Sequence, residues 1–208
     1  MRYLALLLVF ISGVRANGPL TVYAPRPLVA WITQAVGSDA VILVDTAERS
    51  ELALAYREGD ALEAFEGSVV YLADGLPLEN LAEPDRIPIE PRWLGFLLVA
   101  VSEVLAEVRP EQADSFFDQA GSIAKELRLG TYQIRRSLRG VETPVLLYPG
   151  MSAELSDVLT HLGIEWQTVE DGLKLTLPPI ETWESILSPY QSVASALLKL
   201  HQGAPDPQ

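Results

Sequence analysis

Residues 20–44, LTVYAPRPLVAWITQAVGSDAVILV, decide the fold. The runs at 20–24 and 40–44 are short, apolar and contain β-branched residues, a pattern typical of buried strands. Between them, Pro27 favours the start of a helix, apolar residues recur at helical spacing, and Gly37 favours its end. The stretch therefore predicts a strand, a helix and a second strand.

The segment that follows continues this alternation. Residues 50–56 and 60–65 are expected to form short helices separated by Gly59. The run SVVYLA at 68–73 is expected to be the third strand, ended by Asp74. Strand, helix, strand, helix, strand is the order of parallel βαβ units with right-handed crossovers. An α/β fold is predicted.

The middle of the chain has a helical pattern. Apolar residues step by three and four positions in two sets, one starting at Pro91 and the other after Pro110. They predict one helix of ordinary length and one unusually long helix, in which Gly130 is expected to be a weak point.

The last third returns to α/β alternation. The expected elements are strands at 144–148, 164–169 and 173–177, helices at 152–162 and 190–200, and a disordered tail at 203–208. The whole predicts two small βα lobes, at 17–109 and 141–202, joined by a long connecting helix at 110–140.

The first 16 residues have the pattern of a cleavable signal peptide. Arg2 supplies the positive start, residues 3–14 are apolar, and cleavage is expected after Ala16. A buried first strand or helix is the alternative. The chain contains no cysteine, which excludes disulfides, thiolate metal sites and a lipid-modified cysteine at the cleavage point. The expected location is the periplasm, or outside the cell, without stable membrane insertion.

The net charge excludes one class of partner. The chain carries 15 basic and 28 acidic residues, and loss of residues 1–16 would remove two of the basic residues, Arg2 and Arg15. Such an acidic surface repels nucleic acid and anionic lipid, so no nucleic-acid partner is expected. It attracts cations only diffusely, and solubility alone also explains it.

Several motifs have the order and spacing of a known family. They are the opening strand and Pro-containing turn at 20–27, SVVYLADGLPLE at 68–79, Glu90-Pro91-Arg92 before a helix, and RPEQA at 109–113. In this order the chain resembles the zinc- and manganese-binding receptors of ABC importers. The resemblance implies two α/β lobes joined by one rigid helix, a shortened second lobe, and an importer membrane subunit as partner.

The ligands of that family do not carry over. The resemblance implies a cleft metal held by about three histidines and a carboxylate, which suits zinc. Here Glu51 falls near the first ligand position, Arg86 stands where the second histidine belongs, and Ser152 lies near the third. The two histidines, His161 and His201, are interpreted as structural or surface residues.

An oxygen-only site is the remaining metal hypothesis. Its candidate ligands are Asp45, Glu48, Glu51, Asp74 and Glu90, with Glu51 and Glu90 placed first. Carboxylates suit a hard ion such as manganese, calcium or magnesium, so the cofactor is either unknown or a divalent metal other than zinc. Arg86 argues against such a site, because its permanent positive charge repels the ion.

Other chemistry has weaker support. No glycine-rich phosphate loop and no G-x-S-x-G turn is present, and acidic pairs at helical spacing are typical of a solvated face. Trp166 or Trp183 beside Arg86 or Arg92 would bind an organic anion by ring stacking and a bidentate contact to the guanidinium group. Ordinary packing also explains these tryptophans.

Three functions are therefore carried forward. The first is an exported, non-catalytic solute-binding-like protein with an altered or lost metal site. The second is an envelope protein-interaction module on the same scaffold, without a small-molecule site. The third is an enzyme that uses two cleft carboxylates, at least one with a raised pKa.

Overall fold

The computed structural model describes residues 18–203 except for 61–64, 66, 77–86, 88, 142, 181, 183 and 184. The chain divides into two compact units. Unit 1 comprises residues 1–87 and 95–121, and unit 2 comprises residues 88–94 and 122–208. The predicted signal peptide, most of the helix predicted at 60–65, and the tail beyond residue 203 lie outside the described residues.

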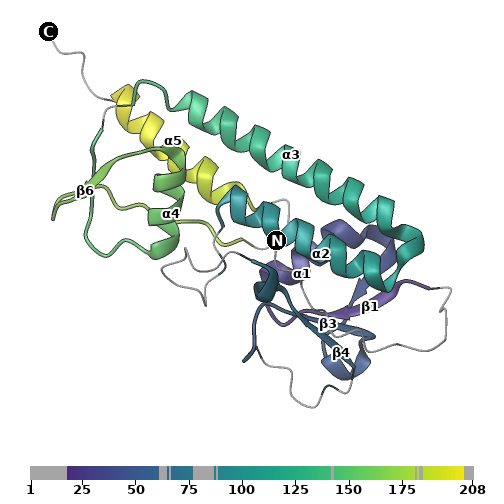
Figure 1. Ribbon diagram of the computed structural model, residues 1–208. Helices are drawn as coiled ribbons and strands as arrows, with labels where there is room; N and C mark the ends of the chain where they lie inside the picture. The colour runs from purple at the N-terminus through teal and green to yellow at the C-terminus, as the bar shows by residue number, and fades with distance from the viewer. Residues whose placement is uncertain are drawn as a thin grey trace, which may run out of the picture. The chain divides into compact units, whose positions relative to one another are not determined.

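Unit 1 is built on a four-stranded parallel sheet (Figure 1). Its strands are β1 (Leu20–Tyr23), β2 (Val41–Leu43), β3 (Leu52–Ala55) and β4 (Ser68–Tyr71), in the spatial order β2-β1-β3-β4. The connection after β1 leads to β2, on one side of the central pair β1 and β3. The connection after β3 leads to β4, on the other side. The carboxyl ends of β1 and β3 therefore form a topological switch point, where α/β sheets commonly bind ligands.

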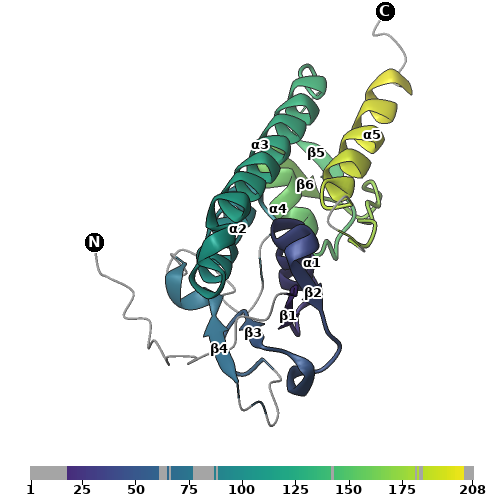
Figure 2. The ribbon, with the colours of Figure 1, turned by 90° about the vertical axis from the view of Figure 1, so that its right-hand side faces the viewer.

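The predicted first helix is confirmed as α1 (Pro27–Gly37), which packs beside β2 (Figure 2). Proline at its first position and the apolar residues Val29, Ile32 and Val36, all buried, account for its start and its inward face. Short 3₁₀ turns follow α1, β2 and β4: η1 (Ser38–Ala40), η2 (Ala47–Arg49) and η3 (Leu72–Gly75).

Gly37, at the end of α1, gives a first testable prediction. A Cβ at this position would clash with the side chain of Val41, which is buried at the start of β2. We expect Gly37→Ala to lower the free energy of unfolding by about 1–3 kcal/mol, because the crowded contact forces a shift in a packed core. Urea titration measures this change. Gly95→Ala in α2 is the matched control, since a Cβ there meets nothing within 4 Å. Equal stability of the two variants would contradict the prediction.

The helix predicted at 50–56 is wrong, because this segment forms β3. Leucine and alanine are good helix formers, and the sequence Leu-Ala-Leu-Ala has no β-branched residue. All four residues are buried, however, in a central strand paired with β1 on one side and β4 on the other. Tertiary burial overrides the local propensity here. The strand at 68–73 is confirmed as β4, which is therefore the fourth strand and not the third.

The two predicted central helices are confirmed. They are α2 (Pro91–Val108) and α3 (Ala113–Ser137), separated by η5 (Pro110–Gln112). The long helix α3 runs through Gly130 without a break, and Figure 1 shows it as one continuous helix. A Cβ at Gly130 would meet Leu187, so this glycine makes room for a neighbouring side chain. Of the helices described, none is both long and apolar enough to cross a bilayer.

Unit 2 contains a two-stranded parallel sheet and its helices. The elements are β5 (Val145–Leu147), α4 (Ala153–Leu162), β6 (Trp166–Thr168) and α5 (Ser188–Gly203). Leu147, Val158, Leu159, Tyr190 and Leu197 lie at the centre of its core. The strand predicted at 173–177 is wrong, since only Leu173 forms a bridge, to Leu147. The segment then runs into Pro178 and Pro179, which cannot donate ladder hydrogen bonds.

Candidate functional site

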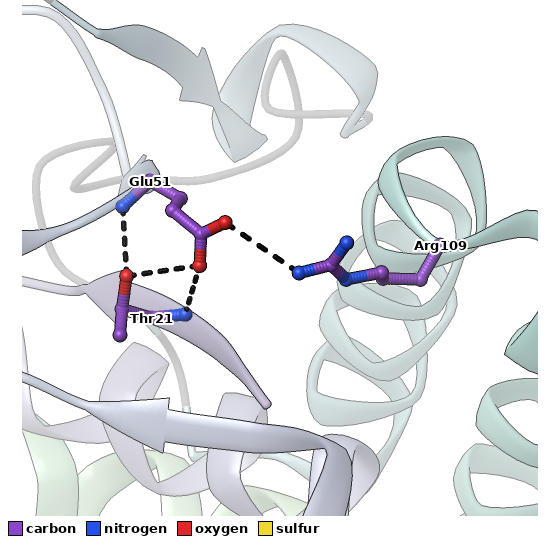
Figure 3. Close-up of polar contacts among 3 residues, drawn as sticks. All are labelled: Thr21, Glu51 and Arg109. Atoms are coloured by element: carbon purple, nitrogen blue, oxygen red, sulfur yellow. Dashed lines mark hydrogen bonds and ion pairs between the residues drawn. The ribbon is translucent and has the colours of Figure 1, made fainter. Parts of the chain in front are cut away.

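Glu51, the first predicted ligand, lies immediately before β3 and contacts two residues of unit 1 (Figure 3). Its carboxylate Oε2 accepts hydrogen bonds from the backbone N of Thr21, at 2.9 Å, and from Thr21 Oγ1, at 3.1 Å. Its backbone N donates to Thr21 Oγ1 at 3.0 Å. The other carboxylate oxygen, Oε1, lies 3.5 Å from a guanidinium nitrogen of Arg109, just after α2.

These contacts occupy both carboxylate oxygens of Glu51. The side chain is 44% exposed, so the ion pair with Arg109 is screened by water and adds little to stability. Arg109 also opposes metal binding at Glu51, because an approaching cation meets its permanent positive charge. Glu51 thus links the start of β3 to β1, and Arg109 lies beside its second carboxylate oxygen.

Asp74 does not share a site with Glu51. Because β3 and β4 are parallel and paired from Leu52–Ser68 to Ala55–Tyr71, Glu51 lies at the amino edge of the sheet. Asp74, in η3 after β4, lies at the carboxyl edge and is exposed. Roughly 13 Å of strand separates the two edges at 3.3 Å per residue. An oxygen-only site that combines these two carboxylates is therefore absent from unit 1.

Glu90, the second predicted metal ligand, is paired with a histidine in unit 2. It lies directly before α2, and its carboxylate Oε1 is 3.5 Å from Nδ1 of His161, near the end of α4. The ring of His161 packs edge-on against Tyr190 of α5, with 5.7 Å between ring centres. The Tyr190 hydroxyl donates to the backbone carbonyl of Ile89 at 3.3 Å. Glu90, His161 and Tyr190 thus form one cluster.

The protonation states in this cluster follow from burial and from neighbouring charges. Burial lowers the pKa of His161, and Arg135 lowers it further, which together outweigh the opposing effect of Glu90. Burial also raises the pKa of Tyr190 far above its usual value, helped by Glu90 and Asp157. At neutral pH the cluster therefore holds a neutral imidazole and a neutral phenol.

The remaining predicted site residues have other positions. Ser152 is the N-cap of α4, where its Oγ accepts a hydrogen bond from the backbone N of Leu155 at 3.3 Å. Arg86 lies outside the described residues. Within the part of the chain that the structure describes, no group of three or more histidine, aspartate or glutamate side chains is placed to hold a metal ion.

A polar cluster at the switch point of unit 1 escaped sequence analysis. Arg26, just before α1, donates from Nε to Asp60 Oδ1 at 2.7 Å, and its terminal nitrogen lies 2.7 Å from the same oxygen. Asp60 Oδ2 accepts from the backbone N of Tyr56, at 2.8 Å, and of Arg57, at 3.4 Å. The Arg26 guanidinium also lies over the Tyr56 ring, 5.1 Å from its centre.

This cluster connects the loops that follow β1 and β3. The Asp60 side chain is only 7% exposed. Burial acts to raise the pKa of Asp60, but the hydrogen bonds and charge of Arg26 and the backbone donors of Tyr56 and Arg57 outweigh it and lower the pKa. Asp60 is therefore a carboxylate at neutral pH. The cluster was missed because residues 50–56 were expected to be helical, which hides the adjacency of the two loops.

No protein-family model matches the chain, and no curated protein matches its sequence. Solved structures do match. A manganese-bound mutant of the periplasmic metal binding protein from Candidatus Liberibacter asiaticus has a TM-score of 0.57 at 10% identity, with coverage of 86% of this chain and 99% of that one. The chain has the fold of periplasmic metal-binding proteins.

Two further structures share this metal-receptor fold. The periplasmic zinc binding protein TroA from Treponema pallidum has a TM-score of 0.55 at 15% identity, covering 76% of this chain and 70% of that one. The laminin-binding protein Lbp of Streptococcus pyogenes has a TM-score of 0.55 at 16% identity, covering 74% and 68%. The α/β fold of metal-receptor type, expected from the resemblance to receptors of ABC importers, is thereby confirmed.

Proposed function

We propose that this chain is an exported, non-catalytic solute-binding protein of the kind that serves ABC importers, in which the histidine-based metal site is altered or lost. Its location is the periplasm or the cell exterior, and its partner is an importer membrane subunit. The class of function rests on the fold, which is shared with a metal binding and a zinc binding periplasmic protein.

One observation carries the loss or alteration of the metal site. The two carboxylates placed first as ligands are each engaged with a basic or imidazole side chain, Glu51 with Arg109 and Glu90 with His161. Arg109 is permanently charged and opposes a divalent cation at Glu51. Glu90 and the neutral His161 supply two ligands, whereas a zinc site needs three or four.

Thermal unfolding of the protein with single metals tests this proposal. After treatment with EDTA, zinc is expected to produce no saturable rise in Tm. A true site would be obvious, because a ligand at a hundredfold excess over its Kd stabilises the folded state by about 2.7 kcal/mol, or several degrees. A saturable shift with zinc would refute the proposal.

Manganese and calcium separate an altered site from a lost one. A saturable shift with either ion indicates an oxygen-ligand site, and it should then disappear in Glu90→Gln or Glu51→Gln. Glu103→Gln is the control, because this exposed carboxylate of α2 is not among the candidate ligands. The absence of any shift leaves an organic solute or a protein partner as what the chain binds.

A protein-interaction module on the same scaffold is the second candidate. It is favoured by one comparison, since a protein described as laminin-binding shares the fold. Unlike the first proposal, it requires no solute site in either unit.

A further inference from the structure

The second half of α3 carries a concentration of positive charge in an acidic protein. Residues 125–139 read KELRLGTYQIRRSLR and contain five basic residues and one acidic residue, a net charge of +4. The whole chain has a net charge of −13, so the remaining residues carry −17. All five basic side chains are exposed, and the whole segment belongs to unit 2.

Three of these basic residues share one face of the helix with two exposed apolar side chains. We define the basic face of α3 as Lys125, Arg128, Leu129, Tyr132 and Arg136. Their spacing of three and four residues places them on one side of a helix. The buried residues Leu127 and Thr131 lie on the opposite side and face the core. Leu129 is 48% exposed and Tyr132 is 54% exposed.

The helix dipole does not account for this charge. Cations are favoured near a helix C-terminus, but the effect fades beyond the last turn. Arg136 lies in that turn, whereas Arg128 and Lys125 lie more than two turns and more than three turns before the end of α3 at Ser137. No carboxylate of the described residues forms an ion pair with Lys125, Arg128 or Arg136. The charge is thus left available to a partner.

We infer that the basic face of α3 docks an acidic segment of a partner protein. Carboxylates of the segment pair with Arg128 and Arg136, whose planar guanidinium groups accept bidentate carboxylate contacts. Apolar side chains of the segment pack on Leu129 and Tyr132. Arginine and tyrosine are enriched at protein interfaces, whereas lysine is depleted, and this stretch has four arginines to one lysine.

An anionic membrane fits the same observations less well. A bilayer is an extended surface, so it also repels the acidic residues of the rest of the chain, whose net charge is −17. The basic face contains only two apolar residues, Leu129 and Tyr132. A helix that lies in a membrane interface buries a whole apolar face in the lipid. A short acidic segment touches the basic face alone.

Fluorescence anisotropy with a defined peptide tests the inference on the full chain. The probe is a labelled 14-residue peptide of aspartate and glutamate with a leucine or phenylalanine at every third or fourth position. A patch of this size is expected to bind it with a Kd on the order of 10 µM at 0.15 M salt, as in a weak, transient interface. The same peptide with asparagine and glutamine in place of its acids is expected not to bind.

Two sets of variants assign the binding to the basic face. R128Q/R136Q is expected to weaken binding at least tenfold, and Lys199→Gln, an exposed charge on α5, is the control that leaves it unchanged. Leu129→Ala is expected to weaken it about threefold, while Leu200→Ala, at a side chain of matched exposure, has no effect. Thermal unfolding confirms that each variant is folded, as expected for exposed positions.

Each other result overturns the inference. These results are absence of peptide binding, equal binding of the amide peptide, and no loss in R128Q/R136Q. Light scattering that shows self-association dependent on Arg128 and Arg136 would make a second copy the occupant. Stronger binding to vesicles containing phosphatidylglycerol than to the peptide would make a membrane the occupant of the basic face. None of these measurements involves a metal, so the metal titration and the peptide titration can fail independently.

Discussion

Replacing Asp60 by alanine is expected to lower the free energy of unfolding by about 3–5 kcal/mol. The Asp60 carboxylate is nearly buried and accepts hydrogen bonds from Arg26 and from the backbone of Tyr56 and Arg57. Its removal leaves the Arg26 guanidinium without this counter-ion and the backbone donors without their acceptor. Urea or thermal unfolding measures the loss. Asp74→Ala, at an exposed carboxylate after β4, is the control and should change stability by less than about 0.5 kcal/mol.

The same residue predicts an acid dependence. The pKa of Asp60 is lower in the folded state than in the unfolded chain, so the folded state favours the ionised form. Its stabilising contribution is therefore fully present above the unfolded pKa of about 3.9 and is lost as the pH falls through the folded pKa. Asp60→Asn should make stability less dependent on pH below about pH 4. An acid limb identical to that of the wild type would show that the pair does not form.

Tyr190→Ala is expected to be comparably damaging, with a loss of about 3–5 kcal/mol. The Tyr190 side chain is fully buried at the centre of the unit 2 core, contacts the ring of His161, and donates a hydrogen bond to Ile89. Truncation leaves a large cavity and an unpaired carbonyl. Denaturant unfolding monitored by circular dichroism measures the loss.

One further variant separates the hydroxyl of Tyr190 from its ring, and a second is a control at an exposed tyrosine. Tyr190→Phe removes only the hydroxyl and should cost about 1 kcal/mol, the net value of one hydrogen bond. Tyr132→Ala removes the same type of ring from the exposed face of α3 and should cost less than about 0.5 kcal/mol. If Tyr190→Ala is tolerated as well as Tyr132→Ala, Tyr190 does not anchor the core of unit 2.

Much of the fold could be predicted from periodicity. The helices α1, α2 and α3 have apolar stripes of helical spacing and proline or glycine at their ends, and β1, β2 and β4 contain β-branched residues. β3 could not be predicted in this way. Its Leu-Ala-Leu-Ala sequence suits a helix, and only pairing with two neighbouring strands makes it a strand.

The candidate site was less predictable, because its contacts join residues distant in sequence. Glu51 was expected to be a ligand, but its partners Thr21 and Arg109 lie 30 and 58 residues away. These contacts depend on which strand neighbours β1, and residue spacing does not encode that choice. The pairing of Glu90 with His161 likewise depends on the packing of α4, and neither residue type identifies the other in advance.

The buried strand β3 has a further consequence for how the chain chooses one alignment over another. Both faces of this strand are apolar, and its sequence repeats every two residues. A displacement by two positions along β1 would put one leucine and one alanine where the same residue type was, so hydrophobic matching at these two positions does not discriminate between the two arrangements. Such a displacement would move the Glu51 carboxylate about 6.6 Å from Thr21 and break its hydrogen bonds. Glu51 therefore contributes to the selection of the native alignment of β3.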